Sequence, residues 1–296
     1  MFLAVYELGK IYFIKKVEEN SIRFAKHNTI NPGKGKRMKI FIMVDMEGIS
    51  GICRADQARP GEDAFNAGRK YLTWDVNACI EGCFRGGAKK VTVRDAHYYG
   101  HNLIWEDLDP RADYVQGETG VERMPGLQDY DGLILLGYHA MAGTPKAILE
   151  HTMSSKEWQN FWMNGKKSGE IAIDAAIAGD KNVPVILVSG DDKACGEARR
   201  FIPGVITAQV KKGLAMDGGI LLAKEKAHTL IRENATLAVK SCKKIKPYKV
   251  KHPVTMRLEL VSRGKIPAGR PYVKVVDGRT FEVTGPTAEA SLLMLD

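Results

Sequence analysis

The chain has 296 residues and a mass of 32.7 kDa, and 44% of the residues are hydrophobic and 27% charged, as in an ordinary globular protein. No apolar run approaches the roughly 18 residues of a membrane span, so an integral membrane protein is excluded. The 44 lysine and arginine residues against 35 acidic ones give a net charge of +9. Because no basic stripe is interleaved with aromatic residues, we expect neither nucleic acid nor a membrane as a partner.

The first 37 residues differ from the rest of the chain. They contain eight lysine and arginine residues against three glutamates, a balance of +5 that leaves only +4 for all other residues. They end in a segment rich in glycine and lysine and precede a second methionine, Met38. We interpret residues 1–37 as a basic, loosely ordered N-terminal extension, and we expect the folded enzyme to begin near Met38.

From Met38 onward, patterns of buried strands alternate with patterns of helices. Near-continuous apolar runs, typical of parallel strands that are covered on both faces, predict strands at 39–44, 91–93, 132–136 and 183–188. Amphipathic patterns predict helices over 62–84, over about 168–178 and within 214–239. This alternation favours an α/β fold with an open, mainly parallel sheet flanked by helices.

The end of the chain has a different pattern. Residues 254–261 alternate between apolar and polar side chains, 272–283 are typical of a hairpin around Asp277-Gly278, and a short helix follows Pro286. We therefore predict an α/β metal-binding catalytic domain over 38–204. The remaining residues, 205–296, would form a smaller α+β portion with a role in oligomerisation or substrate access.

The cysteines indicate a reducing compartment. Five cysteines without a repeated spacing give no disulfide framework. The apolar stretches near the N-terminus are interrupted by charged residues, and no small-residue cleavage site follows, unlike in a secretory signal peptide. Both observations predict a cytoplasmic protein.

Polar side chains directly follow each of the first three predicted buried strands. Asp45 and Glu47 come after the first strand, Asp95 and His97 after the second, and His139 after the third. The carboxyl ends of parallel strands line one edge of an open α/β sheet, where ligands bind. Carboxylate oxygens and imidazole nitrogens are what zinc binds when thiolates are absent, and a carboxylate between two ions can bind one with each oxygen.

Each of these residues alone has an ordinary structural explanation. An Asp-x-Glu sequence after a strand often forms a turn or a cap, and a histidine at a strand end is more often a satisfied, partly buried residue than a ligand. The combination is more specific, because four of the seven histidines, His97, His101, His139 and His151, fall between residues 97 and 151. Of these four, His101 is expected at the exposed rim.

Five short motifs occur in order between residues 38 and 192. They are Val44-Asp45-Met46-Glu47-Gly48-Ile49-Ser50-Gly51, Arg94-Asp95-Ala96-His97, Leu136-Gly137-Tyr138-His139-Ala140, Thr144-Pro145 with His151-Thr152-Met153, and Gly169-Glu170. Together they resemble the zinc-dependent D-aminopeptidases first known from a bacterial dipeptide-transport operon, with near-identical spacing. The resemblance weakens through 205–296.

The resemblance implies two zinc ions per subunit and five protein ligands. Asp45 would bridge the two ions, Glu47 and His139 would complete the protein ligands of one ion, and His97 and Glu170 those of the other. An acidic residue at the start of a helix, the place predicted for Glu170, is also favoured by the helix dipole.

His151 aligns with the residue proposed as the catalytic nucleophile of the family. A water shared by two zinc ions is already a strong nucleophile, so a role of His151 as general acid or base, or as a donor to the developing oxyanion, explains the same placement. We expect His151 to be catalytic in one of these roles. Asp95 is interpreted as a carboxylate that orients an imidazole.

The predicted function is therefore that of a binuclear zinc aminopeptidase acting on the N-terminal residue of short peptides. A preference for D-residues, as in D-Ala-D-Ala, and a homo-oligomeric, decameric ring are implied only by the resemblance. A carboxylate near the metals would hold the α-ammonium group of the substrate. The alternatives are another two-metal hydrolase (a deacylase, amidase or phosphatase) on the same site, or a non-enzymatic metal-binding protein. A phosphatase is disfavoured because the motifs include no glycine-rich phosphate loop and no arginine cluster.

Overall fold

The computed structural model describes residues 38–295, so the predicted N-terminal extension, 1–37, lies outside the described residues. Seven strands form a first sheet: β1 (Lys39–Val44), β2 (Lys90–Asp95), β3 (Asp113–Val115), β4 (Gly132–Leu136), β7 (Val185–Asp191), β8 (Ile206–Ala215) and β9 (Gly218–Leu221). Five strands form a second sheet: β5 (Trp158–Met163), β6 (Lys166–Lys167), β10 (Val254–Leu260), β11 (Lys274–Val275) and β12 (Thr280–Gly285).

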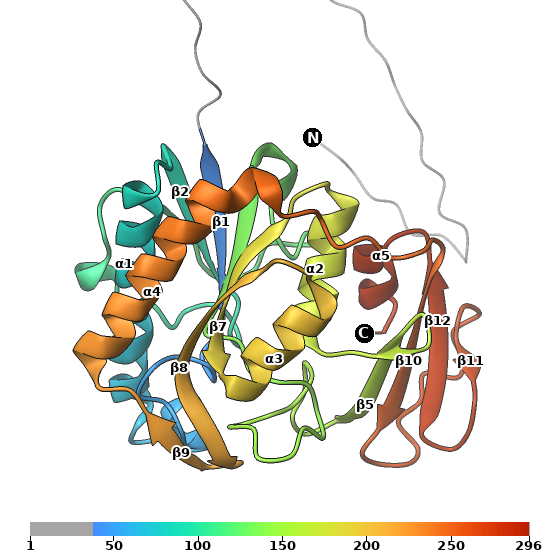
Figure 1. The fold of residues 1–296 in the computed structure, drawn as a ribbon. Coiled ribbons are helices and arrows are strands. Elements are labelled where there is room, and N and C mark those ends of the chain that lie inside the picture. Colours follow the sequence, from blue (N-terminus) through green and yellow to red (C-terminus); the bar gives the residue numbers. More distant parts are fainter. Residues whose placement is uncertain (1–37, 296) are drawn as a thin grey trace, which may run out of the picture. The chain divides into compact units, whose positions relative to one another are not determined.

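The first sheet has the strand order β3-β2-β1-β4-β7-β8-β9 (Figure 1). All its neighbours run parallel except β8 and β9 at one edge, which are antiparallel. The second sheet, in the order β11-β12-β10-β5-β6, is entirely antiparallel. These observations confirm the predicted fold class, an open, mainly parallel sheet flanked by helices and accompanied by a smaller α+β portion.

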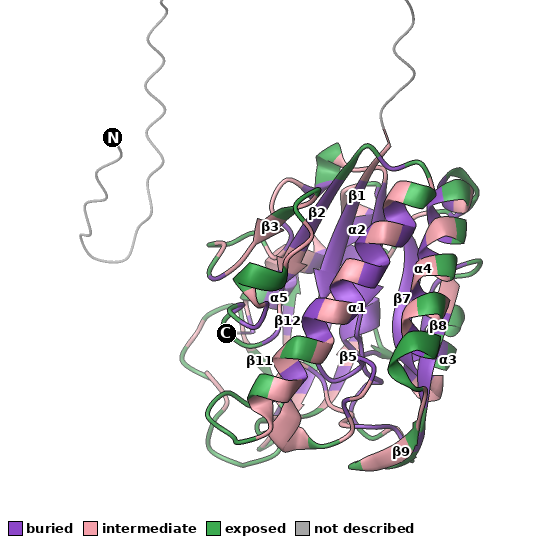
Figure 2. Cartoon of the chain, turned by 90° about the vertical axis from the view of Figure 1, so that its left-hand side faces the viewer, coloured by how far each residue is buried: buried purple, intermediate pink, exposed green. Residues whose placement is uncertain are grey.

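Five α-helices surround the sheets: α1 (Phe65–Arg85), α2 (Glu170–Asp180), α3 (Asp192–Phe201), α4 (Lys224–Ser241) and α5 (Ala288–Leu293). Helices α1 and α4 pack on each other over one face of the first sheet, whereas α2 and α3 cover the other face (Figure 1). Helix α1 buries the stripe formed by Leu72, Val76 and Ile80, and the residues on its outer side are partly or fully exposed, as Figure 2 shows. Within 38–295, no helix combines the length and the hydropathy that crossing a membrane requires.

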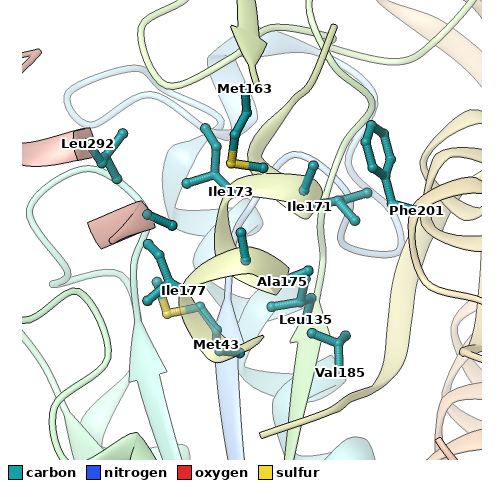
Figure 3. Packing of buried hydrophobic residues seen from close by; sticks show 14 of the residues in the cluster. Met43, Leu135, Met163, Ile171, Ile173, Ala175, Ile177, Val185, Phe201 and Leu292 are labelled. Atoms are coloured by element: carbon teal, nitrogen blue, oxygen red, sulfur yellow. The ribbon is translucent and has the colours of Figure 1, made fainter. Parts of the chain in front are cut away.

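Helix α2 is apolar on all sides because it lies between the two sheets. Every residue from Glu170 to Gly179 is buried. Ile171 and Ile177 belong to a core that also contains Met43 and Leu135 of the first sheet and Met163 of the second (Figure 3). A helix that is hydrophobic all round has to be covered on all sides. This packing fixes the position of its first residue, Glu170.

The division between the sheets does not follow the predicted domain boundary at residue 205. Strands β8 and β9 and helix α4 come after that boundary, yet they complete the first sheet and its cover. Strands β5 and β6 come before it and pair into the second sheet through β10. The predicted boundary followed a change in local pattern, and a local pattern does not show which distant strand becomes the partner.

Candidate metal centre

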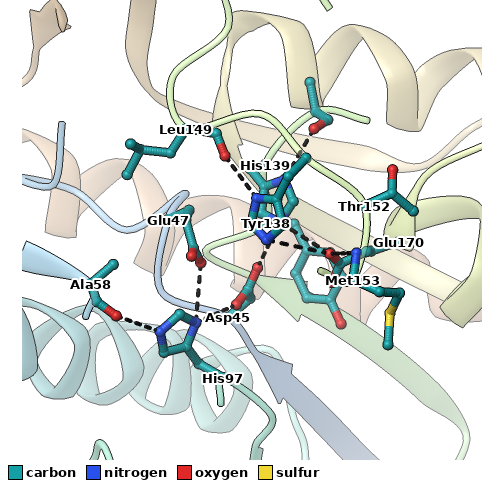
Figure 4. A network of polar contacts seen from close by, with 12 residues as sticks. Asp45, Glu47, Ala58, His97, Tyr138, His139, Leu149, Thr152, Met153 and Glu170 are labelled. Atoms are coloured by element: carbon teal, nitrogen blue, oxygen red, sulfur yellow. Dashed lines mark hydrogen bonds and ion pairs between the residues drawn. The ribbon is translucent and has the colours of Figure 1, made fainter. Parts of the chain in front are cut away.

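Three adjacent strands bring the predicted ligands together. Asp45 and Glu47 follow β1, His97 follows β2 and His139 follows β4, and β1 pairs with both β2 and β4. Glu170 is the first residue of α2. All five side chains are buried, with at most 8% of each residue exposed. The structure thus gathers all five predicted ligands at the carboxyl edge of the sheet, as Figure 4 shows.

Two glycines allow the loops after β1 and β4 to approach each other. Gly137 has a φ of +75°, and a Cβ atom there would lie 2.3 Å from the main-chain oxygen of Asp45. A Cβ atom at Gly48 would lie 2.0 Å from the main-chain oxygen of Tyr138. Any other residue at either position would push the two loops apart, and His139 would move away from Asp45.

The side chains form two groups that share Asp45. His97 Nδ1 lies 3.1 Å from Asp45 Oδ1 and 3.2 Å from Glu47 Oε2. His139 Nε2 lies 3.3 Å from both Asp45 Oδ2 and Glu170 Oε1. Each oxygen of Asp45 therefore faces a different histidine, so its carboxylate stands between the two groups. In these distances Glu47 accompanies His97 and Glu170 accompanies His139, whereas the family resemblance paired Glu47 with His139 and His97 with Glu170.

Main-chain carbonyls orient both imidazoles toward the carboxylates. A carbonyl oxygen only accepts hydrogen bonds, so the ring nitrogen beside it carries the proton. His97 Nε2 donates to the oxygen of Ala58 at 2.7 Å, and His139 Nδ1 donates to the oxygen of Ala140 at 3.0 Å. The other nitrogen of each ring faces the shared carboxylate of Asp45, which is the orientation that metal-binding histidines require.

Buried ligand atoms without hydrogen-bond partners show that these residues fit a metal ion. Within 38–295, four buried side-chain atoms have no hydrogen-bond partner, and three of them are Asp45 Oδ2, Glu47 Oε2 and His139 Nε2. An unsatisfied buried polar group costs free energy, so its presence in a native structure needs an explanation such as a bound ion. Two sets of donor atoms lie within 4.8 Å of one another: Asp45, Glu47 and His139 form one set, and His139, His151 and Glu170 the other. Carboxylate and imidazole donors are what zinc binds.

The charges of these groups shift one another's pKa values. Burial raises the pKa of Asp45, but the neighbouring His139 and His97 outweigh burial and hold that pKa well below its usual value. In the same way, burial is outweighed by the charge of His139, which lowers the pKa of Glu170 to about 2. Burial lowers the pKa of both histidines, yet the neighbouring carboxylates raise it well above 6.5. A cation that binds here must therefore displace imidazole protons.

His151 lies parallel to His139, with the ring centroids 4.0 Å apart and the planes at 11°. Its Nδ1 donates to the main-chain oxygen of Leu149 at 2.9 Å, and its Nε2 lies 3.8 Å from Glu170 Oε1. Leu149 and Met153, two residues away on either side, have φ values of +52° and +56°. Such a conformation is unusual for these side chains and is typical of functional loops. The loop thus presents the free Nε2 of His151 to the site.

A cavity of about 560 Å³ opens onto the site, a size typical of small-molecule pockets. Its walls include four of the predicted ligands and His151, together with Arg59, Arg123, Glu150 and Met216. Arg123 was not expected near the site. Its guanidinium group is held by Asp174, which lies one turn after Glu170 on α2, with 2.5 Å between Arg123 Nε and Asp174 Oδ1.

Two of the residues assessed from the sequence lie outside the site. His101 is exposed, as expected. Asp95 does not orient an imidazole, so that interpretation was wrong. Its carboxylate accepts hydrogen bonds from the main chain of Asn102 and Leu103 and from the Asn102 side chain, and it thereby fixes the loop after β2. The loop after β2 returns to the end of the strand, so its own donors satisfy the Asp95 carboxylate. The ring of His97 is oriented by the main-chain oxygen of Ala58 and not by Asp95.

Comparisons with known proteins agree with this geometry. The family model Peptidase_M55, described as D-aminopeptidase, matches residues 38–296. A D-aminopeptidase of Bacillus subtilis (strain 168) is 35% identical over 230 residues, which cover 77% of this chain and 83% of that protein. The structure of "Zn-dependent D-aminopeptidase DppA from Bacillus subtilis, a self-compartmentalizing protease" matches with a TM-score of 0.83 and 31% identity over 87% of this chain and 96% of that one. The chain belongs to the M55 family of D-aminopeptidases.

Proposed function

We propose that this protein is a zinc-dependent aminopeptidase that hydrolyses the N-terminal residue of short peptides with D-residues. One observation carries the proposal: five carboxylate and imidazole side chains converge at a strand-end cavity, and three of their buried ligand atoms lack a hydrogen-bond partner. The zinc-dependent relative of similar structure, and the D-aminopeptidase named for the family, support the metal and the substrate class.

We further propose two zinc ions per subunit, with Asp45 as the bridging ligand. Glu47 and His139 are proposed as the other protein ligands of one ion, because their donor atoms and one of Asp45 lie within 4.8 Å of one another. His97 and Glu170 are proposed for the second ion, as the family resemblance implies. Bound zinc ions supply Lewis-acid polarisation of a carbonyl group and a water of lowered pKa. The two-ion count is supported by the position of Asp45, each of whose oxygens faces a different histidine.

His151 transfers protons at Nε2 in this proposal. The hydrogen bond from Nδ1 to Leu149 leaves a lone pair on Nε2, directed toward the cavity that the peptide enters. From there the imidazole takes a proton from the attacking water and returns it to the leaving amine. Its stacking on His139 holds the ring in this orientation. Recovery of a peptide fragment acylated at His151 would instead assign the nucleophile role.

Glu150 is the residue that we propose for the α-ammonium group of the substrate. It lines the cavity beside His151 and is half-buried, and its Oε2 accepts a hydrogen bond from the main-chain nitrogen of Gly143 at 2.5 Å. The main-chain nitrogen of Thr144 also interacts with this carboxylate, and the two oxygens together offer about four acceptor sites, which leaves room for a ligand. A carboxylate that pairs with the α-ammonium group explains why an aminopeptidase requires a substrate with a free N-terminus.

We also propose that the protein assembles into a homo-oligomer in the cytoplasm. The relative of similar structure is described as self-compartmentalizing, which supports an assembly that encloses its active sites, and a decameric ring is our specific prediction. The five cysteines are free, which supports a reducing compartment. Light scattering of the purified protein tests the subunit number. A role of residues 205–296 in oligomerisation or substrate access remains a prediction.

The test is to measure zinc content and hydrolysis together. The protein is stripped with a chelator, restored with zinc and given D-Ala-D-Ala or L-Ala-L-Ala. We expect about two zinc ions per chain and zinc-dependent cleavage of the D-peptide alone. A His101→Ala variant, which removes an exposed histidine outside the site, is the matched control and should behave like the parent.

The other outcomes identify the alternatives. Binding of two zinc ions without cleavage of either peptide would support the metal site and refute the proposed substrate class. Acylated amines and phosphate esters would then be tested. Zinc binding without any hydrolysis would favour a non-enzymatic metal-binding protein. A chain that binds no zinc would refute the proposed function.

A further inference from the structure

Lys211 of β8 is a fully buried lysine that contacts the segment of the chain carrying two of the proposed ligands. Only 2% of the residue is exposed. Its Nζ donates to three main-chain oxygens, those of Glu47 at 2.5 Å, Ile49 at 2.9 Å and Ile52 at 2.6 Å. An ammonium group has three N–H donors, and these three acceptors use all of them. We call residues 45–52 the metal-site loop.

A β-bulge directs Lys211 toward this loop. In the pairing of β7 with β8, Gly190 faces Gln209 and Asp191 faces Lys211, so Val210 is an extra residue in β8. As a result Val210 and Lys211 are both buried, whereas Lys212 is exposed. Bulges of this kind redirect a side chain and are frequent beside active sites. The buried position of Lys211 is therefore built into the sheet.

Two further attachments of the metal-site loop leave the carbonyl groups of Glu47 and Ile52 to Lys211, whereas the carbonyl group of Ile49 also accepts from the main-chain nitrogen of Ile52. Ser50 donates to Asp75 of α1 from both its main-chain nitrogen and its hydroxyl group, at 2.8 and 2.6 Å. The main-chain nitrogen of Gly48 donates to the oxygen of Gly137 at 2.7 Å. Both attachments use donors of the loop. Without an ammonium group, the buried carbonyl oxygens of Glu47 and Ile52 would lose the hydrogen bonds that Lys211 gives them. The oxygen of Ile49 would keep only the main-chain nitrogen of Ile52, at 3.3 Å. Such a loss is costly enough to make the loop rearrange.

We propose that Lys211 is a positioning residue for the metal centre, which sets the main chain at Glu47 so that its carboxylate faces His97. The hydrogen bond to the Glu47 carbonyl and the 3.2 Å between Glu47 Oε2 and His97 Nδ1 are the two observations that connect Lys211 to the site. This inference rests on the proposed function, in which Glu47 is a zinc ligand. The second ion, for which Glu170 is a proposed ligand, does not depend on Lys211 for that residue.

The experiment is a zinc titration of the full-length chain against a chromophoric chelator, with zinc alone as the probe. Mutation of a residue that orients a metal ligand typically lowers the metal affinity by about 10–100-fold. We expect Lys211→Met to lower the affinity for one of the two zinc ions by about that factor and to leave the affinity for the other unchanged. A purely structural role would lower the melting temperature without selecting one ion.

Lys249→Met is the matched control. Lys249 also donates to a main-chain oxygen, that of Gly179, and to the side chain of Asn182. Both acceptors lie at the opposite end of α2 from Glu170, about 15 Å away along the helix. The same substitution there should leave both zinc affinities and the hydrolysis rate unchanged.

Double variants assign the affected ion. Residues that act on one ligand are coupled, whereas independent sites are additive. Lys211→Met should therefore add little to the loss caused by Glu47→Gln, and should add fully to the loss caused by Glu170→Gln. If Lys211→Met does not accumulate as folded protein, Lys211→Arg retains the charge but presents a planar fork instead of three radiating donors, and the same selective loss is expected.

The possible failures are distinguishable. No zinc on the unmodified chain would refute the proposed function, and a single zinc ion would refute the two-ion centre on which the role of Lys211 rests. Two zinc ions on the unmodified chain, together with Lys211 variants that bind both ions normally or lose both equally, would refute the role of Lys211 and leave the proposed function intact. Full additivity of Lys211→Met with Glu47→Gln would refute it as well.

Discussion

Asp174→Asn is the substitution that most directly tests the buried ion pair beside the candidate metal centre. The Asp174 carboxylate is fully buried on α2, one turn after Glu170. It accepts hydrogen bonds from Tyr138 Oη at 2.5 Å and from Arg123 Nε and Nη2 at 2.5 and 3.2 Å. Asparagine keeps the shape and one acceptor but removes the negative charge. Arg123 then retains Glu170 as its nearest anion, with 4.0 Å between Nη2 and Oε2.

The magnitude follows from the burial of the pair. Removing one partner of a buried ion pair costs about 3–5 kcal/mol, because the other charge stays buried without compensation. The side chain of Arg123 is 19% exposed and has Glu170 nearby, so we expect the lower end, about 3 kcal/mol. For a domain of this size that corresponds to a fall in melting temperature of about 6–12 °C. Arg123 should also pair more closely with Glu170, and this pairing should lower the affinity for the zinc ion that Glu170 is proposed to bind.

The assay is thermal unfolding followed by circular dichroism, combined with a zinc titration. The double variant Arg123→Gln with Asp174→Asn removes both charges, so it should recover at least half of the stability lost in the single variant. Asp56→Asn, which removes an exposed partner of Arg54, is the control and should leave the melting temperature unchanged. A double variant that is as unstable as the sum of its single variants would refute the explanation by an uncompensated charge.

Three further predictions concern the site itself. His139→Ala should lose at least one zinc ion and all turnover, whereas His151→Ala should keep its zinc and lose turnover, as elemental analysis and a peptide assay would show; loss of zinc in the second variant would make His151 a ligand. Neighbouring carboxylates outweigh burial and raise the pKa of both His97 and His139 well above 6.5, so the binding of two zinc ions at pH 7 should release about one proton from each histidine. The affinity for each ion should weaken about tenfold per pH unit below the raised pKa. Calorimetry in buffers of different ionisation enthalpy counts the protons, and no release would contradict this prediction. Glu150→Gln should raise KM about 10–100-fold, because one charge-assisted hydrogen bond to the α-ammonium is worth about 1.5–3 kcal/mol, and an unchanged KM would remove Glu150 from substrate binding.

Four of the five proposed ligands, all except Glu170, could be placed at one site from the sequence because their positions depend on local signals and one topological rule. Glu170 was added only by the family resemblance. The apolar runs at 39–44 and 132–136 coincide with β1 and β4, and the residues that follow them include Asp45 and His139. Parallel strands present their carboxyl ends at one edge, so the sequence distance between the ligands did not matter. The geometry that divides the five ligands into two groups depends on side-chain directions, which spacing alone does not determine.

Other parts of the fold were missed because their signals are weak or distant. Strand β3 has three residues and β6 has two, too few for a periodic pattern. Strand β8 and its partner β9 replace the first part of the helix that was predicted within 214–239, and α4 begins only at Lys224. Whether such segments pair depends on neighbours far along the chain.

The charged residues around the site, Lys211, Arg123 and Asp174, could not be predicted from local sequence patterns. Lys211 and Lys212 are adjacent and chemically identical, yet one is 2% exposed and contacts the metal-site loop while the other faces solvent. A single extra residue in the pairing of β7 with β8 makes this difference. Likewise, Arg123 and Asp174 lie 51 residues apart and meet only because α2 is enclosed between two sheets. Four of the five proposed ligands lie at strand ends, where sequence patterns indicate them, but tertiary packing decides which charged groups hold the proposed ligands in place. The substitutions at Lys211 and Asp174 therefore examine the part of the site that depends on the fold as a whole.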